Sequence, residues 1–474
     1  MCVQSRDDIS VASGADAKVP DAIGLRSLLV KKSFSRAFAV AAAGVSVLAL
    51  SAPAAAQGGR VTTPDRNRQQ SAPQQAAASR APAVSRGFQT AYQPVNAAIT
   101  AQNWAAADGA LAALKAAASS PYERFLAAHA DFRIANGLRN DARVATAATA
   151  MVDSNGAPAT EMPVVYAVAA QTAFRSRDFA AAAARAERAQ QLGATEPALA
   201  NIALDALFRS NQTDAGLARY RALLAAAQTA GRPLPEDAYS ITAAALQAAN
   251  RNNDLIDVLV KRAVAYPTAF NFRAGTQVFL QNRPEDRGLS IDGLRLLTAA
   301  NAMNNRNFWI EYGRNMIDDA APNEALQVVT AARTAGVVTA SDRTFSEIET
   351  LARGKLAEDR ASLPGSETRA RARPDAQLAT RVGDAYLSYG DYAKAEEFYR
   401  LAQGKTGADA GLINTRVGIA RFRAGNYARA IEAFNAVQGT RQPLAQMWAA
   451  LAQSKLTPAA TAPATPAPAA PARN

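Results

Sequence analysis

Near the end of the chain the sequence repeats itself, and this repeat constrains the fold more than any other feature. The stretch GDAYLSYGDYAKAEEFYRLA at 383–402 returns as GIARFRAGNYARAIEAFNAV at 418–437, a shift of 418 − 383 = 35 residues. Small residues recur where two helices could approach closely, and aromatic residues recur where the space between helices must be filled. A glycine also recurs midway through each copy, where a turn would join two helices. The repeat therefore predicts helix-turn-helix units and an all-α fold.

The repeated unit resembles the tetratricopeptide repeat, a helix-turn-helix of about 34 residues. The resemblance implies a right-handed superhelical solenoid of about nine helical pairs with a concave binding groove and a terminal cap at 443–456. It is clearest over 375–456, weaker over 90–228 and weakest between them. The positions that the alignment assigns to helix packing are Gly383, Ala395, Gly418 and Ala430, with Ala182 and Gly216 in the more degenerate copies.

The start of the chain predicts export. Residues 26–56 combine a basic region, the apolar stretch FAVAAAGVSVLAL and the small residues of a cleavage site, which is the pattern of a secretory signal. Cleavage after Ala56 would make Gln57 the first residue of the mature chain and would remove Cys2. The alternative is a buried alanine-rich helix. The apolar stretch is too short to cross a bilayer comfortably, so we expect no transmembrane span in the mature chain and a periplasmic location, with secretion as the alternative.

Composition and pattern divide the chain into segments of different character. Stretches rich in Gln, Pro, Ser and Ala without apolar periodicity predict disorder, whereas amphipathic stretches between short turns predict helices. The expected segments are a signal peptide with a long n-region (1–56), a disordered basic linker (57–87), degenerate repeats (88–235), irregular helical repeats (236–361), a linker or hinge (362–374), C-terminal repeats with a capping helix (375–456) and a Pro/Ala-rich disordered tail (457–474).

The charge of the chain bears on its partners. Lys and Arg total 52 against 40 Asp and Glu, a formal net charge of +12. An exported chain meets little nucleic acid, so we expect no nucleic-acid partner. The positive field would suit an acidic protein surface, a lipid surface or an anionic polymer of the cell envelope. The arginine content could equally reflect a GC-rich coding sequence.

Residue counts exclude several classes of catalytic and metal site. With one cysteine and one histidine, His129, the chain cannot form a Cys/His zinc site, a Ser-His-Asp triad or a disulfide framework. Glycine-rich phosphate loops are absent, so we expect no cofactor. The acidic pairs Asp318-Asp319 and Glu396-Glu397 are interpreted as solvated helix surface, and His129 as a packed or half-exposed histidine.

One recurring dipeptide suggests a binding surface. Phe-Arg recurs near the end of four predicted first helices, and in tetratricopeptide repeats such positions border the groove. Stacking would align their arginines as a ladder that could bind carboxylates. The alternative is a solvated arginine favoured by the helix dipole. The predicted partner-binding residues are Arg133, Arg175, Arg209 and Arg423.

Other positions argue against one specialised function of the family. Members that grip C-terminal carboxylates use Lys, Asn and Arg sets in their first helices. This chain has Thr380, Arg381, Thr415 and Arg416 on the corresponding faces. We therefore do not transfer the peptide-clamp function to it.

The sequence predicts a non-catalytic periplasmic scaffold or adaptor that binds a protein, or an envelope component, in a concave groove. One alternative is an enzyme that acts on envelope polysaccharide with carboxylates on a helical solenoid. Another is a structural subunit of an export or polymer-assembly machine. Clustered acids in the groove would favour the enzyme, and arginines would disfavour it.

Overall fold

The structure is a computed structural model that describes residues 82–456. The predicted signal peptide, most of the 57–87 linker and the 457–474 tail lie outside these residues. The predicted linker, 57–87, extends too far, because the first described helix, α2, already begins at Arg86. Ser85 caps that helix, since its side chain accepts a hydrogen bond from the backbone N–H of Phe88.

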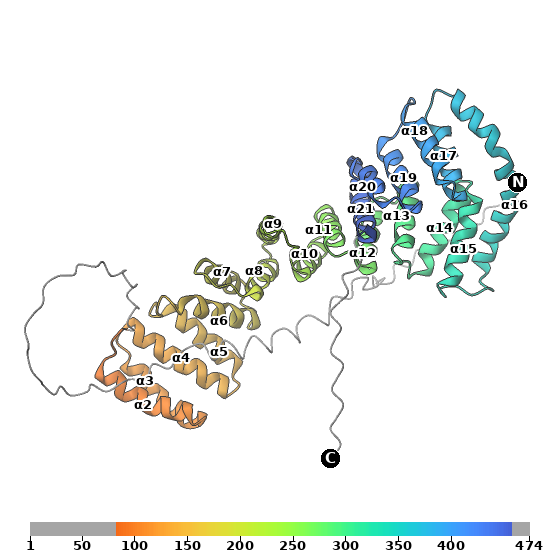
Figure 1. The fold of residues 1–474 in the computed structure, drawn as a ribbon. Helices are drawn as coiled ribbons and strands as arrows, with labels where there is room; N and C mark the ends of the chain where they lie inside the picture. Colours follow the sequence, from red (N-terminus) through yellow and green to blue (C-terminus); the bar gives the residue numbers. More distant parts are fainter. Residues whose placement is uncertain (1–81, 457–474) are drawn as a thin grey trace, which may run out of the picture. The chain divides into compact units, whose positions relative to one another are not determined.

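The described chain divides into two compact units between Ala249 and Asn250. The helices of each unit can be followed in Figure 1. The N-terminal unit contains α2 (Arg86–Thr100), α3 (Trp104–Ala117), α4 (Pro121–Gly137), α5 (Asp141–Asp153), α6 (Met162–Arg175), α7 (Phe179–Gln191), α8 (Pro197–Arg209), α9 (Thr213–Thr229) and α10 (Glu236–Ala248). The C-terminal unit contains α11 (Asn252–Ala265), α12 (Ala269–Gln281), α13 (Arg287–Ala299), α14 (Arg306–Asp318), α15 (Pro322–Thr334), α16 (Arg343–Ala372), α17 (Gln377–Tyr389), α18 (Tyr392–Gln403), α19 (Ala410–Arg423), α20 (Tyr427–Asn435), the short 3₁₀ turn η1 (Gly439–Arg441) and α21 (Gln442–Leu456).

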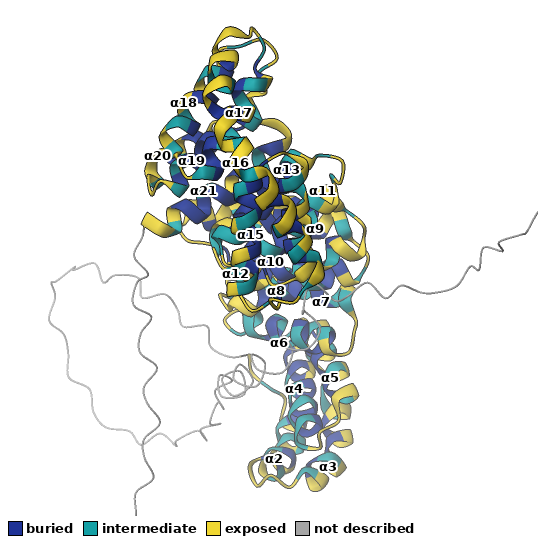
Figure 2. Ribbon diagram, turned by 90° about the vertical axis from the view of Figure 1, so that its right-hand side faces the viewer, coloured by how far each residue is buried: buried dark blue, intermediate teal, exposed yellow. Residues whose placement is uncertain are grey.

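The predicted all-α, helix-turn-helix architecture is confirmed for residues 82–456. This part of the chain contains no β-strand, only an isolated bridge between Asp375 and Thr406. Consecutive helices pack against each other as antiparallel neighbours within each unit, and their apolar faces are buried between them (Figure 2). No helix within the described range is both long and apolar enough to cross a membrane.

The turns inside successive helix pairs share one backbone form. In five of them a residue with positive φ comes directly before an Asn or Asp at the N-cap position of the second helix. In the two clear C-terminal repeats that residue is Gly390 (φ 80°) or Gly425 (φ 79°), as predicted for the interhelical turn. In the N-terminal unit the same position holds Gln102 (φ 55°), Arg139 (φ 57°) and Arg177 (φ 64°). The geometry of the turn is therefore kept where its glycine is not.

The small residues assigned to helix packing lie where helices touch. A Cβ added to Gly418 would stand 2.4 Å from the ring of Phe434, and one added to Gly383 would stand 2.6 Å from that of Tyr399. No side chain could occupy those positions without moving an aromatic ring. The remaining assigned positions are Ala182, Ala395 and Ala430, each fully buried, and Gly216, where a Cβ would stand 2.7 Å from the Phe208 ring.

The C-terminal unit closes on itself, which the sequence did not predict. Helix α21 packs against its neighbour α20 and also against α11 and α12 at the start of the unit. The Nε1–H of Trp448 donates to the backbone oxygen of Asp292 (3.2 Å), and a Cβ added to Gly275 would stand 2.9 Å from the sulfur of Met447. A helix is present at the predicted cap, 443–456, but it does not have the character of a cap. A solenoid cap has a polar outer face, whereas α21 buries apolar side chains between two ends of one unit.

The predicted hinge at 362–374 is also wrong. Residues up to Ala372 continue α16, a helix of 30 residues that contains Pro364. Leu363 and Ala370 are buried on the unit, and Asp359 accepts a hydrogen bond from the hydroxyl of Tyr389 (2.6 Å). These tertiary contacts on both sides of the proline outweigh its cost within a helix. The division between compact units lies instead after α10, not at 235 or within 362–374.

Candidate functional site

The predicted arginine ladder falls in the N-terminal unit, except for its fourth member. Arg175 is exposed at the end of α6, and Arg133 is half-buried on α4. Arg209 donates from Nε to Asp205 (2.8 Å), and its guanidinium lies over the rings of Phe174 and Phe179, at 5.7 and 5.6 Å from their centroids. A contact with the preceding helix pair thus orients Arg209. Its role in binding stays a prediction.

Arg423 lies in the other unit, apart from these three arginines, and its role in partner binding stays a prediction. It ends α19 in the C-terminal unit, where its Nη2 donates to Oε1 of the buried Glu324 (2.8 Å). Nearby carboxylate charge raises the pKa of Arg423 although burial opposes this. The Phe-Arg pattern could not distinguish this arginine from the others, because its partner lies 99 residues away in the sequence.

A chamber of about 800 Å³ lies within the C-terminal unit. Its walls come from α13, α14, α16, α17, α19 and the loop before α19. Thr380, Arg381 and Arg416, which the sequence placed on the faces that bear ligand contacts in the family, all line it. Thr415 does not: its hydroxyl donates to the backbone oxygen of Gly411 within α19 (2.7 Å). The volume falls in the range of ligand-binding pockets.

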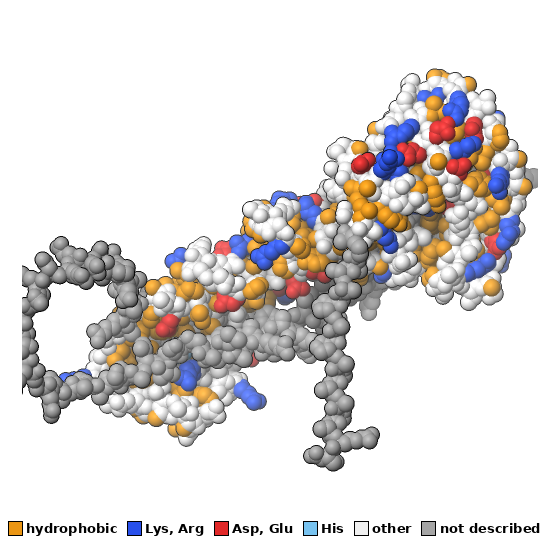
Figure 3. Space-filling view, in the orientation of Figure 1, with side chains coloured by type: hydrophobic (Ala, Val, Ile, Leu, Met, Phe, Trp, Pro, Cys, Tyr) orange, Lys and Arg blue, Asp and Glu red, His pale blue; other side chains and the backbone are white. Residues whose placement is uncertain are grey.

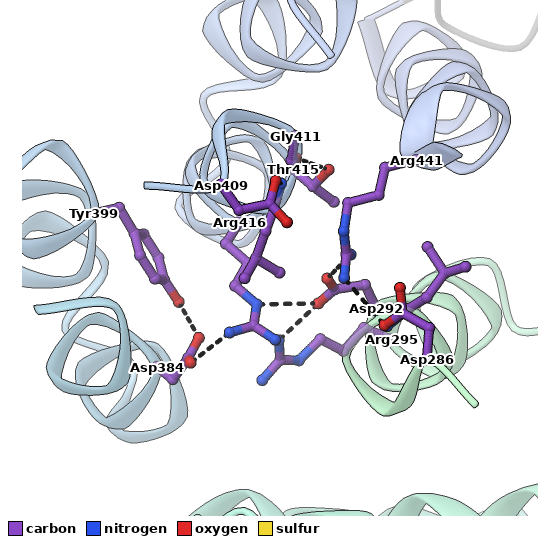
Figure 4. A network of polar contacts seen from close by, with 12 residues as sticks. Asp286, Asp292, Arg295, Asp384, Tyr399, Asp409, Gly411, Thr415, Arg416 and Arg441 are labelled. Carbon is purple, nitrogen blue, oxygen red and sulfur yellow. Dashed lines mark hydrogen bonds and ion pairs between the residues drawn. The ribbon is translucent and has the colours of Figure 1, made fainter. Parts of the chain in front are cut away.

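A buried carboxylate, Asp292 on α13, organises one side of the chamber (Figure 4). Its Oδ1 accepts from Arg295 Nη1 (3.0 Å), and its Oδ2 accepts from Arg441 Nη1 (2.9 Å). The Nε of Arg416 lies 3.6 Å from Oδ1. Asp292 is 0% exposed, so these three guanidinium groups replace the water that would otherwise solvate it. They come from α13, α19 and η1, which the carboxylate thereby joins.

Arg416 connects this cluster to Asp384 on α17. The guanidinium donates to Asp384 Oδ2, and the hydroxyl of Tyr399 donates to Oδ1 (2.7 Å). Burial raises the pKa of Asp384 above its ordinary value, against the opposing charge of Arg416. Burial alone would lower the pKa of Arg416, but Asp384 and Asp292 together raise it. The pair is therefore a charged floor for the chamber, which both residues line.

The second half of the network is centred on Glu324, which is 1% exposed on α15. Arg295 binds both of its oxygens, through Nε (3.0 Å) and Nη2 (2.6 Å), and the hydroxyl of Tyr312 donates to Oε1 (2.8 Å). Burial by itself raises a carboxyl pKa, but Arg295 and Arg423 hold the pKa of Glu324 below its usual range. Arg295 thus bridges the two halves of the network, since it also binds Asp292.

The chamber walls carry more acid than base. Of the arginines that line it, Arg287 pairs with Asp319 (3.3 Å). Among the described residues, Asp318, Asp359 and Asp409 line the chamber without forming an ion pair with a lysine or arginine. Arg381 also lines the chamber without an ion pair to a described residue, so three unpaired acids stand against one unpaired base, and this negative excess suits a basic ligand. No cluster of three or more His, Cys, Asp and Glu suited to a metal occurs between residues 82 and 456.

Charges on the outer surface follow a different pattern. Basic and acidic side chains lie next to each other over α18 and α19 in Figure 3. Partly exposed ion pairs of this part of the unit are Arg400–Glu396 within α18 (3.1 Å) and Lys394–Glu367 between α18 and α16 (2.7 Å). Exposed pairs of this kind contribute little to stability and present no net charge to a partner. The unpaired acids of the chamber are therefore the more distinctive electrostatic feature of the unit.

Sequence reasoning missed the buried network, although one signal was available. The stretch LSIDGLRLL in α13 is apolar on nearly all sides and contains a single Asp and a single Arg three residues apart. Such charges inside a helix that is buried all round require partners. The sequence could have shown that Asp292 and Arg295 are buried, but not which distant residues pair with them.

Comparison with known proteins adds little to this description. No known family model matches the chain, and no curated protein resembles it in sequence. Similar solved structures include the APC/C hetero-tetramer Cut9-Hcn1, with 14% identity over 79% of this chain and 84% of that chain, and a TM-score of 0.19. Another is Naa15/Naa10 bound to HypK-THB, with 11% identity over 76% and 70% and a TM-score of 0.17. At such TM-scores the chains do not superpose, so the architecture rests on the helix pairing in this chain.

Proposed function

We propose that the protein is a non-catalytic, exported scaffold that holds a basic segment of a protein partner in the chamber of its C-terminal unit. The proposal rests on the acidic side chains of the chamber wall that form no ion pair within residues 82–456. Asp318, Asp359 and Asp409 face a space of about 800 Å³ without a basic partner among the described residues. Lysine or arginine side chains of a bound segment would supply that partner.

The cellular location is part of the same proposal. It is supported by the signal-like pattern of residues 26–56, which predicts export to the periplasm. An anionic envelope polymer fits the chamber poorly because the excess wall charge is negative. Such a polymer would suit the arginines of the N-terminal unit, Arg133, Arg175 and Arg209. A structural role in an export or polymer-assembly machine uses the same chemistry and differs only in the partner's identity.

The test is crosslinked affinity capture from the native envelope with matched variants. The chamber variant combines Asp318→Lys with Asp409→Ser, because Ser retains the N-cap that Asp409 provides to α19. The control is Asp257→Lys, which changes a half-exposed acid on α11 outside the chamber. We expect the chamber variant to lose partners that the wild type and the control retain. Capture of the same proteins by all three would overturn the proposal, as would recovery of abundant soluble proteins alone.

One observation favours a second candidate, hydrolysis of envelope polysaccharide. Asp384 lines the chamber and burial raises its pKa, which is a property of general acids. Its contacts with Arg416 and Tyr399 hold both of its oxygens, which argues for a positioning role instead. Purified protein incubated with envelope glycans separates these functions. Product release that Asp384→Asn abolishes would establish the enzyme, whereas no product from either protein supports the scaffold.

A further inference from the structure

A second depression lies on the C-terminal unit, separate from the chamber. It is a groove of about 640 Å³ between the end of α13, α14 and one face of α15, and it shares no lining residue with the chamber. Gln327, Thr330 and Thr334 follow one another along α15 at helical spacing and form one side. None of the described residues that line the groove is charged. The groove is therefore uncharged, whereas the chamber wall is acidic.

The donors that the groove offers to a ligand come from two side-chain amides, not from its tryptophan. Trp309 lines the groove and is 3% exposed, yet its Nε1–H has no hydrogen-bond partner in the structure. That nitrogen is enclosed by its neighbours, so a ligand in the groove does not reach it. The side-chain amides of Asn323 and Gln327 both donate to the backbone oxygen of Ser388, at 2.5 and 2.9 Å. Each amide nitrogen retains a second hydrogen. The groove thus offers N–H donors to a ligand rich in acceptors.

These features select one class of ligand. A charged ligand would find no counter-charge in the lining. A sugar would need an aromatic face to stack on, and the single aromatic residue of the lining, Trp309, is buried. A polypeptide that contains proline meets the requirement, because each proline keeps its carbonyl acceptor and lacks an N–H donor. Proline also fixes φ, so such a segment loses little conformational entropy when it binds.

A segment of this chain has the required composition. Residues 457–474 read TPAATAPATPAPAAPARN, with no charged side chain before Arg473. The segment continues directly from α21 of the same unit. Extended at about 3.1 Å per residue, it would reach roughly 50 Å. A unit of this length has a radius of gyration of about 17 Å, so the segment is long enough to reach another face of it. We propose that residues 457–474 bind in the α15 groove and place backbone carbonyls against the second amide hydrogens of Asn323 and Gln327.

The test follows the indole N–H signals of the three tryptophans by ¹⁵N NMR. The chain is ended after Leu456, which retains every described helix, and is titrated with a synthetic peptide of residues 457–474. We expect the Trp309 indole signal to move while those of Trp104 and Trp448 stay fixed. In the full chain the Trp309 signal should have the chemical shift of the bound state at every protein concentration, because the chain supplies its own segment. Added peptide should bind to the full chain at least tenfold more weakly than to the shortened chain.

Two substitutions of exposed threonines provide the matched control. Thr330→Lys places a charge in the groove, and Thr350→Lys places one on α16 outside it; both hydroxyls donate only to a carbonyl of their own helix. The first should weaken peptide binding at least tenfold, and the second should leave it unchanged. The proposal is overturned by a Trp309 signal that the peptide does not move, or that an uncharged glycan moves instead. It is also overturned if the bound signal of the full chain appears only at high concentration, since a neighbouring copy would then supply the segment.

Discussion

Removal of the Asp292 carboxylate should destabilise the C-terminal unit far more than removal of a surface carboxylate. Asp292 accepts two charge-assisted hydrogen bonds, at 3.0 and 2.9 Å, and is fully buried. Each such bond contributes about 1.5–3 kcal/mol, and loss of one member of a buried ion pair costs about 3–5 kcal/mol. Arg295 retains Glu324 in the variant, so the middle of that range applies. We expect Asp292→Ala to lower the free energy of unfolding by about 4 kcal/mol.

The assay is urea unfolding of the full chain followed by tryptophan fluorescence. In a Trp104→Phe background the remaining emission comes from Trp309 and Trp448, which are both buried in the C-terminal unit. Asp292→Asn separates charge from volume: it keeps the size and one acceptor oxygen, so its loss should be smaller than that of Asp292→Ala. The control is Asp257→Ala, which breaks an exposed pair with Lys261 and should cost no more than about 0.5 kcal/mol.

The comparison can refute the reasoning directly. If Asp292→Ala and Asp257→Ala shift the unfolding midpoint equally, then water or side-chain movement solvates the three guanidinium groups. The buried network would then not stabilise the closed unit. If Asp292→Asn costs as much as Asp292→Ala, negative charge rather than packing carries the whole effect.

Three further predictions concern packing and pH. Gly418→Ala should destabilise the C-terminal unit by about 1–3 kcal/mol in the same assay because its Cβ would meet the Phe434 ring, whereas Gly354→Ala, at an open helical position, should stabilise it by about 0.5–1 kcal/mol. Burial, together with a neighbouring arginine, lowers the pKa of His129 to about 4. The folded N-terminal unit therefore binds fewer protons than the unfolded chain. The protection factors of α4, which correct hydrogen exchange for its intrinsic pH dependence, should fall as the pH falls from about 6.5 to 4, and His129→Gln should flatten this profile. The pKa of Glu324 is held below its ordinary value of 4.5, so its contribution is present above that pH and lost below it. Urea midpoints of the C-terminal unit should fall on acidification below pH 4.5, and less steeply in Glu324→Gln.

The sequence could predict the helix pairs but not their full register. Gly390 and Gly425 mark the interhelical turn clearly, because glycine adopts positive φ at little cost. At Gln102, Arg139 and Arg177 the same backbone form is present without a residue that signals it. The repeat therefore cannot be recognised from the sequence at these turns, because tertiary packing holds a residue other than glycine at positive φ. Pro364 led to the opposite error. It suggested a break in the helix at 362–374, but the tertiary contacts of α16 keep the helix continuous.

The candidate site was less accessible to sequence reasoning than the fold. Faces of α17 and α19 could be assigned to a groove because they belong to recognisable repeats. The opposite wall could not, since α13, α14 and α16 belong to the region where the repeat signature is lost. The pairing of Arg441 with Asp292 joins residues 149 positions apart, and no local pattern specifies such a partner.

The closed form of the C-terminal unit accounts for the arginines in its interior. Alanine-rich helices pack closely but leave little apolar volume where they diverge around a central space. Arginine side chains are long enough to cross that space, and their planar groups bind carboxylates in fixed geometry. Burial of these ions contributes less net stability than an apolar core would, but each pair forms only when its helices stand in one arrangement. Asp292 meets Arg441 only if η1 and α21 have returned to α13. The network therefore selects the closed arrangement over an open solenoid of the same helices, and two of its arginines, Arg295 and Arg416, also line the chamber.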